Sequence, residues 1–256
     1  MESPITTVCR RRFGSSSQTG SVYGAANVNN SNDLNAQYGQ APFSRPHRFV
    51  LTYQYELPIR ATGALGKVVT GWSVSGLTLL QTGNPLTLQD GRGGTAFVGA
   101  PANNTEKGVS TATLCPGVTY DQITTTGKVK DRLGSIANPS LTRFFKPGAA
   151  SAGVFCAPAV IGNDGLATAW GTTGIGIVRS PGQTNTDISV TKMTRIGERQ
   201  SVQFRAEFFN AFNHAQFAMP STIGSTSLRV DNPNFGLITA TSVNPRIIQL
   251  ALRYQF

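Results

Sequence analysis

The sequence predicts an all-β fold of antiparallel transmembrane β-barrel strands, about five in number, joined by long loops. Three observations predict it. First, residues 246–256 alternate strictly between apolar and polar side chains over the roughly 9 to 11 residues that a tilted strand needs to cross a bilayer. Second, similar segments recur upstream. Third, the connections between them alternate between long and short, as they do in transmembrane barrels.

The composition argues against other classes of protein. Only 39% of the 256 residues are hydrophobic, and no run approaches the 18 or more apolar residues of a transmembrane helix. The net charge of +10 would suit a nucleic-acid partner, but outside Arg10–Arg12 the cations are scattered singly, with no basic helix and no zinc-finger spacing. We therefore expect no nucleic-acid partner. A cationic surface could equally face anionic lipid headgroups.

The first spanning strand is expected at residues 48–57, and Pro58 ends it. Its apolar face would carry Phe49, Leu51, Tyr53, Tyr55 and Leu57. The second is expected within residues 70–88, where the apolar phase slips by one near Gly76. A β-bulge at Gly76 would restore the pattern. A strand buried on both faces explains the slip as well.

Three further strands are expected toward the carboxyl terminus. Residues 187–196 alternate, with Lys192 on the apolar face, where its amine must extend to the membrane interface. A tight turn at residues 197–199 leads into residues 201–208, which alternate without interruption. The last strand is 246–256, whose apolar face holds Ile248, Leu250, Leu252, Tyr254 and Phe256. In isolation such a strand would equally suit the edge of a soluble sheet.

Connection lengths predict an orientation. Residues 14–47, 89–185 and 213–245 form long connections, whereas 58–69 and 197–199 are short. Because outer-membrane barrels have long outward loops and short periplasmic turns, the carboxyl terminus is expected on the periplasmic side. The segment from Asp90 to Asn185 is then an exposed loop and the expected place of substrate contact.

The cysteines and the amino terminus leave questions open. Cys9, Cys115 and Cys156 have no metal-site spacing. Cys115 and Cys156 lie in one loop region and could pair in an oxidising compartment, but unpaired thiols fit equally. Arg10–Phe13 superficially resembles a twin-arginine signal, yet no apolar segment follows, so we expect no signal peptide in the chain as given. Residues 1–13 remain unassigned, and residues 14–256 are assigned to the barrel portion.

Several motifs resemble one family of proteins. They are PHRFVL (residues 46–51), GWSVSG (71–76), QTGNP (81–85), RSPGQ (179–183), TDISV (186–190), FRAEFFNAFNH (204–214), NFGLIT (234–239) and NPRIIQLALRYQF (244–256). In this order they resemble the carboxyl-terminal end of TonB-dependent outer-membrane receptors of the Oar-like type. The resemblance covers roughly residues 30–256.

The resemblance implies a barrel of about 22 strands with a plugged lumen. Such a protein lies in the outer membrane of a Gram-negative bacterium and imports a nutrient or passes a polypeptide with energy from TonB. This chain shows no TonB box and no plug, and five strands cannot close a barrel without leaving backbone groups unpaired in lipid. It is therefore expected to be a fragment of a receptor, with TonB acting through the plug of the parent. The sequence names no substrate.

Candidate site residues follow from the same strands. His47 and His214 stand alone, so we expect no enzyme, no metal site and no cofactor. The resemblance implies that the alternating tail is read by the outer-membrane assembly machinery, through Leu250, Leu252, Tyr254 and Phe256. Arg205, Glu207 and Arg253 are expected to face the lumen, where they could contact the plug or a substrate, or simply line a wet wall.

A second class of protein fits the same pattern less fully. A soluble extracellular β-sandwich would also show amphipathic strands and could bind glycan or protein through its loops. The two classes differ in what covers the apolar face, which is lipid in a barrel and a second sheet in a sandwich.

Overall fold

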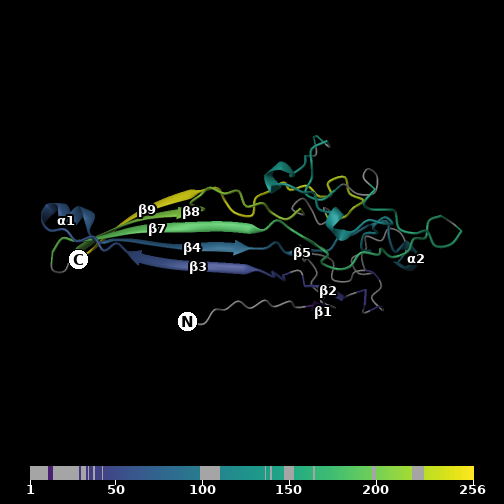
Figure 1. The fold of residues 1–256 in the computed structure, drawn as a ribbon, viewed down its shortest axis with the longest axis horizontal. Helices are drawn as coiled ribbons and strands as arrows, with labels where there is room; N and C mark the ends of the chain where they lie inside the picture. The colour runs from purple at the N-terminus through teal and green to yellow at the C-terminus, as the bar shows by residue number, and fades with distance from the viewer. Residues whose placement is uncertain are drawn as a thin grey trace. The chain divides into compact units, whose positions relative to one another are not determined.

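The computed structural model describes residues 11–13, 29, 33, 35–36, 38–41, 43–98, 110–135, 137–138, 140–146, 153–163, 165–197, 200–220 and 228–256 (Figure 1). The chain divides into two compact units. The sheet unit comprises His47–Gln81, Gly182–Gln216 and Thr241–Phe256. The loop unit comprises Met1–Pro46, Thr82–Pro181 and Phe217–Ala240. Residues 1–10, which belong to the unassigned amino-terminal segment, and Glu198 and Arg199 of the expected tight turn lie outside the described residues.

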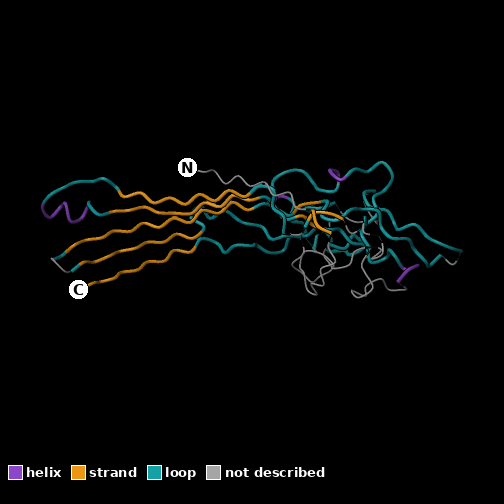
Figure 2. The backbone as a smooth tube through the Cα atoms, turned by 90° about the horizontal axis from the view of Figure 1, so that it is seen from below, coloured by secondary structure: helices purple, strands orange, loops and turns teal. Residues whose placement is uncertain are grey.

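The sheet unit is one five-stranded antiparallel sheet in the order β3-β4-β7-β8-β9 (Figure 2). Its strands are β3 (Arg48–Glu56), β4 (Trp72–Gln81), β7 (Gln183–Arg195), β8 (Ser201–Phe209) and β9 (Ile247–Gln255). All five expected strands are therefore present. They are 9 to 13 residues long, which suits tilted spanning strands. Among the described residues the sheet is open, with β3 and β9 at its edges.

The bulge predicted at Gly76 is wrong. Gly76 pairs directly with Tyr53 on β3 and with Ile188 on β7, and the register continues unbroken on both sides. The apolar phase slips because Leu77 and Leu79 project to the polar face of a regular strand. A Cβ atom at position 76 would lie 2.4 Å from the Tyr53 hydroxyl, so the Tyr53 side chain occupies the space above the glycine. Burial on both faces does not explain the slip either, because Leu77 remains exposed.

The short connection between β3 and β4 contains a helix that the sequence did not predict. Helix α1 (Gly63–Val69) ends where the Thr70 N–H and hydroxyl both donate to the Gly66 carbonyl. Two side chains from the sheet donate to further carbonyls at this end of α1. Trp72 Nε1 bonds the Val68 oxygen at 3.1 Å, and Lys192 Nζ bonds the Lys67 and Thr70 oxygens at 2.8 Å each. Gly63 begins the helix with φ +76°, a conformation that favours glycine.

The loop unit contains little regular structure. β1 (Arg11–Phe13) pairs with β2 (Tyr38–Gln40), and β5 (Pro85–Leu86) pairs with β6 (Val178–Arg179). Single helical turns occur at α2 (Thr95–Val98), η1 (Tyr120–Gln122) and η2 (Val129–Asp131). No helix among the described residues is long and apolar enough to cross a membrane.

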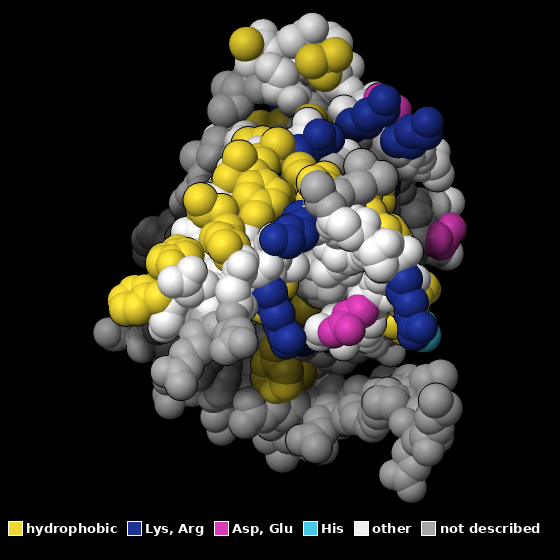
Figure 3. All heavy atoms as spheres, turned by 90° about the vertical axis from the view of Figure 1, so that its left-hand side faces the viewer, with side chains coloured by type: hydrophobic (Ala, Val, Ile, Leu, Met, Phe, Trp, Pro, Cys, Tyr) yellow, Lys and Arg dark blue, Asp and Glu magenta, His cyan; other side chains and the backbone are white. Residues whose placement is uncertain are grey.

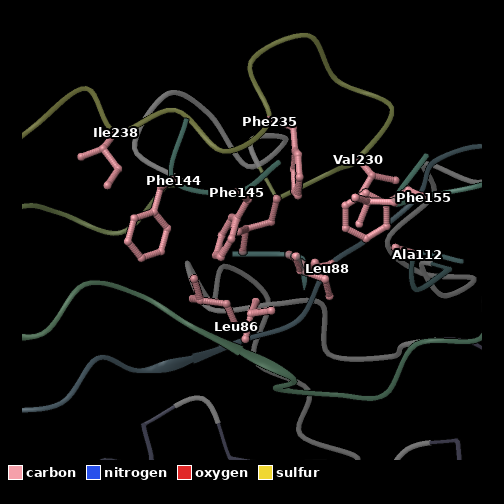
Figure 4. Close-up of a cluster of buried hydrophobic side chains, with 13 residues drawn as sticks. Leu86, Leu88, Ala112, Phe144, Phe145, Phe155, Val230, Phe235 and Ile238 are labelled. Atoms are coloured by element: carbon pink, nitrogen blue, oxygen red, sulfur yellow. The ribbon is translucent and has the colours of Figure 1, made fainter. Parts of the chain in front are cut away.

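A hydrophobic core nevertheless holds this unit together (Figure 4). Phe145 and Phe235 stack with ring centroids 5.8 Å apart, and Phe155 meets Phe235 edge-on at 5.6 Å. Leu86 and Leu88 are fully buried in the same cluster. Asp90–Asn185 is mostly loop, as expected, but it is not exposed throughout, because Phe145 and Phe155 are buried in this core. Its apolar residues are sparse and show no period, because they meet a core built from segments far apart in the sequence.

A disulfide joins Cys115 to Cys156 in this unit, so of the two alternatives the pair is the one found. The bond links two segments that also exchange backbone hydrogen bonds. Cys115 N–H donates to the Val154 oxygen, and Cys156 N–H to the Thr113 oxygen. The cysteines therefore lie within a packed region.

Candidate functional site

The register of the sheet brings most of the apolar side chains of the five strands onto one face. Directly opposed neighbours include Tyr55 with Val74, Val74 with Val190, Val190 with Ala206 and Ala206 with Leu250. We call this surface the apolar face; besides these residues it comprises Phe49, Leu51, Tyr53, Trp72, Leu80, Ile188, Val202, Phe204, Phe208, Ile248, Leu252 and Tyr254. Figure 3 looks at the end of the sheet unit that carries α1, where apolar side chains gather along one side and Lys and Arg along the other.

Much of the apolar face is exposed to solvent. In β9, Leu250 is 66% exposed, Leu252 74% and Tyr254 52%, and the terminal Phe256 is 93% exposed. Every residue of β3 and β9 is exposed, and the described residues of the sheet unit contain no second sheet. A contiguous exposed apolar surface of this kind marks contact with a membrane or another protein.

The four residues of the expected assembly signal lie on the apolar side of the edge strand. Leu250 and Leu252 oppose Ala206 and Phe204 of β8, and Tyr254 opposes Val202. The Tyr254 and Phe256 rings stack with centroids 6.0 Å apart. The outer edge of β9 pairs with no other described strand.

The opposite face is mostly polar and carries the three residues expected to line a lumen. Arg205, Glu207 and Arg253 all project from this polar face, and Arg205 Nη1 lies 3.6 Å from Glu207 Oε1. Arg253 opposes Gln203, and no described residue forms an ion pair with it. The polar face can therefore contact water or charged groups, whereas the apolar face can contact hydrocarbon.

Lys192 lies on the apolar face, as expected, and its amine reaches the end of the strand. Besides its two bonds to α1, it sits 5.3 Å from the centroid of the Trp72 ring. A lysine with its amine satisfied at the strand end, beside a tryptophan, is typical of a membrane interface.

Sequence reasoning missed the polar residues that fix the turn after β8. Buried Asn210, at φ +49°, accepts a hydrogen bond from the His214 N–H and donates to the His214 and Asn244 oxygens. Its own N–H donates to Asp187 Oδ1 at 2.8 Å. Gln216, also buried, accepts from the Thr184 N–H and donates to the Thr184 oxygen. These bonds join the ends of β7, β8 and β9, and residues 204–214 contain a motif that carried the family resemblance.

Paired charges in the loop unit are structural. Asp231 accepts hydrogen bonds from Arg229 and from the Gly91 N–H, and buried Asp90 accepts three from Arg92, one from its backbone N–H and two from its guanidinium. Burial alone would raise the pKa of Asp231, but these hydrogen bonds and the charge of Arg229 hold the pKa of Asp231 below its usual value. Among the described residues no group of three or more His, Cys, Asp or Glu is placed to hold a metal ion.

One protein-family model matches nearly the whole chain. The model described as an outer membrane beta barrel domain matches residues 11–249. Searches of curated proteins and of solved structures found no match. The matched range includes β3, β4, β7 and β8 of the sheet and the start of β9. In a barrel of this family, an antiparallel sheet with one exposed apolar face forms part of the wall and would place that face against lipid. The chain belongs to the outer membrane β-barrel domain family.

Proposed function

We propose that this chain contributes wall strands and loops to a TonB-dependent receptor of the Oar-like type in the outer membrane of a Gram-negative bacterium. The parent would import a nutrient or pass a polypeptide with energy from TonB. The observation that carries the membrane part of this proposal is the single apolar face that runs through the register of five strands. The transport part rests on the motif resemblance, and the proposal names no substrate. No catalytic role is proposed.

The proposal includes an orientation. The connections 82–182 and 210–246 both leave the sheet at the end opposite α1, and we place them outside the cell. The Cys115–Cys156 disulfide is compatible with this side and with the periplasm, because both surroundings are oxidising, so the orientation rests on the lengths of the connections. Helix α1 and Phe256 would then face the periplasm, with Lys192 and Trp72 at the interface.

Two surfaces receive roles in this proposal. Leu250, Leu252, Tyr254 and Phe256 are the segment that the outer-membrane assembly machinery reads, and the exposed outer edge of β9 suits recognition by strand addition. Arg205, Glu207 and Arg253 face the lumen, where the plug or the substrate passes. The plug is the route by which TonB would act on the parent.

A charge placed on either face tests the membrane assignment. Leu250→Arg puts a guanidinium on the apolar face, at a cost of about 2 to 4 kcal/mol if the residue lies near the bilayer midplane. Gln249→Arg is the matched control at the same depth, since it puts the charge on the polar face directly opposite Glu207. Ala251→Arg is a poorer control because it would oppose Arg205.

The measurement is the folded yield of the parent barrel that contains this chain, in lipid bilayers of increasing thickness, because five strands alone would leave backbone groups unpaired in lipid. We expect Leu250→Arg to lose yield by an amount that varies with thickness, because the depth of the charge changes, while Gln249→Arg stays near wild type. Equal insertion of the two variants would refute the assignment of the apolar face to lipid. A loss for Leu250→Arg that is the same in every bilayer and in detergent would favour a soluble fold in which this face is buried by protein.

A further inference from the structure

The polar face of the sheet carries apolar side chains at one end, where the sequence pattern slips. Leu77 and Leu79 of β4 project to this face, and Val50 of β3 lies directly opposite Leu79. Beyond β7, Phe209 and Ile247 oppose each other directly on the same face. We call these five residues the inner apolar patch. All but Leu79 are exposed in the sheet.

The inner apolar patch lies at the end of the sheet opposite α1. β3 begins and β4 ends at this end, and Figure 1 shows α1 at the other end of β4. Under the proposed function this face lines the lumen and this end faces outward. The next row of side chains toward α1 is wholly polar, as a lumen wall ordinarily is: Gln54, Ser75, Ser189, Glu207 and Gln249. An apolar patch on such a wall indicates an apolar partner.

Asp187 of β7 lies at the centre of the inner apolar patch. On one side Leu77 opposes it directly. On the other side Phe209 occupies the corresponding position, because Ile188 opposes Phe208 one residue earlier in β8. Neighbouring strands are about 4.8 Å apart. A group that sits on the Asp187 carboxylate would therefore have an apolar side chain on each side of it.

The half-buried Asp187 carboxylate has no cation beside it. Its Oδ1 accepts hydrogen bonds from Asn185 Nδ2 at 3.1 Å and from the Asn210 N–H at 2.8 Å. Among the described residues no donor bonds its Oδ2 and no side chain forms an ion pair with it. The buried Asn185 Oδ1 beside it also accepts no hydrogen bond from the described part of the chain. The site therefore offers acceptors to a ligand that brings N–H donors and a positive charge.

We propose that Asp187 and the inner apolar patch bind an amphipathic cation. An ammonium or guanidinium group pairs with Asp187, and apolar groups on its two sides pack on Leu77 and Phe209. The inference rests on the proposed function and deepens it by naming the chemical class of the substrate. It also gives the slip in the β4 pattern a role. The same chemistry occurs in a lysine or arginine between apolar residues of a peptide and in a small organic amine.

Peptide binding to the parent barrel that contains this chain tests the site. Isothermal titration calorimetry in lipid nanodiscs compares acetyl-Leu-Lys-Phe-amide with two controls. Acetyl-Leu-Gln-Phe-amide lacks the charge, and acetyl-Gly-Lys-Gly-amide lacks the apolar side chains. We expect the first peptide to bind about tenfold more tightly than either control, since each control loses one of the two interactions.

A small amine distinguishes the two sources of this chemistry. Dibutylammonium has a protonated nitrogen between two apolar chains and no peptide backbone. If it displaces acetyl-Leu-Lys-Phe-amide, or binds where the peptide does not, the site takes small organic amines. If the peptide binds and dibutylammonium does not compete with it, the site takes a polypeptide.

Two variants assign the interactions to residues. Asp187→Asn keeps the acceptor for the Asn210 N–H and should abolish the preference for lysine over glutamine in the peptide. Glu56→Gln removes the same charge from the polar face at the α1 end and should leave that preference unchanged. Leu77→Ser should lower the preference for the apolar peptide over acetyl-Gly-Lys-Gly-amide several-fold. If Asp187→Asn weakened all three peptides equally, the carboxylate would only support the fold, and the inference would be overturned.

The outcomes separate this inference from the proposed function. A parent barrel that binds the three peptides equally, or that binds neither acetyl-Leu-Lys-Phe-amide nor dibutylammonium, overturns the inference. The inner apolar patch would then be covered by protein. The proposed function is judged separately by the contrast between Leu250→Arg and Gln249→Arg in bilayers, because those positions lie outside this site. Loss of that contrast would refute the lipid-facing sheet and with it the placement of this site in a lumen.

Discussion

At the scale of single residues, Gly76 is a position in β4 where the packing leaves no room for a side chain. A Cβ atom there would lie 2.4 Å from the Tyr53 hydroxyl and 2.6 Å from the Asp187 oxygen. We expect Gly76→Ala to lower the free energy of unfolding by about 1 to 3 kcal/mol, since the sheet must shift to admit the methyl group.

The measurement is urea denaturation of the parent barrel that contains this chain, inserted in lipid. Ser75→Ala, the next residue along on the polar face, is the control and should change stability little. If Gly76→Ala were as stable as Ser75→Ala, the close packing of Tyr53 on the glycine would be wrong.

The lowered pKa of Asp231 predicts how the stability of the loop unit changes as the pH falls. The pKa of this carboxyl is lowered in the folded chain, so its contribution to stability is present above the unfolded pKa of about 3.9 and is lost as the pH falls through the folded pKa. Asp231→Asn removes the charge that pairs with Arg229 and should cost about 1 to 3 kcal/mol at pH 7. It should also make unfolding less sensitive to pH below about 4.

Thermal unfolding at a series of pH values from 7 to 2.5 checks this. The comparison is with Asp131→Asn, which changes the charge equally at an exposed site in η2. Parallel pH curves for wild type and Asp231→Asn would contradict a stabilising role for the ionised carboxylate.

At the scale of elements, the Cys115–Cys156 bond closes a loop within the unit that lacks regular structure. Its two cysteines are 41 residues apart, and cross-links of this kind typically stabilise by about 2 to 4 kcal/mol. We expect the double variant Cys115→Ser, Cys156→Ser to unfold at lower urea concentration and to be cut faster by protease between residues 110 and 160.

Limited proteolysis followed by mass spectrometry measures this effect. Cys9→Ser leaves the disulfide intact and serves as the control. Unchanged cleavage rates in the double variant would mean that the hydrophobic core alone holds this region.

The strands were the elements most accessible to sequence reasoning. β3 and β9 fall within one residue of the expected ranges because their side chains alternate over the whole length. β4 was harder, since Leu77 and Leu79 break the alternation in an otherwise regular strand. Helix α1 carries no apolar period at all, and its end is fixed by Lys192 and Trp72 from other strands.

The candidate surfaces were predictable to a similar extent. Alternation alone places Leu252 and Arg253 on opposite faces, and the register confirms that these faces are shared by all five strands. Alternation does not reveal Asn210 or Gln216, which act through hydrogen bonds between distant segments. The roles of these surfaces in assembly and in the lumen remain predictions.

At the scale of the whole molecule, regular sheet and irregular loop follow different rules. The strands of the sheet unit can be predicted one by one from the two-residue alternation of apolar and polar side chains. The loop unit is specified by a few aromatic and aliphatic residues whose partners are remote, so no local pattern identifies them. Phe145, Phe155 and Phe235 each lie in a segment that looks like plain loop when read alone.

The core of the loop unit also bears on the order of folding. Gln89 exchanges backbone hydrogen bonds with Leu228 and Val230, so this core joins a segment before β7 to a segment after β8. The core of the loop unit therefore stays incomplete until the segment that follows β7 and β8 in the sequence is in place. Contacts between such distant segments form slowly. The folding rate of this protein is therefore expected to be limited by the closure of its loops. The hairpin β7–β8 would form first, as an intermediate in which the core of the loop unit is still incomplete.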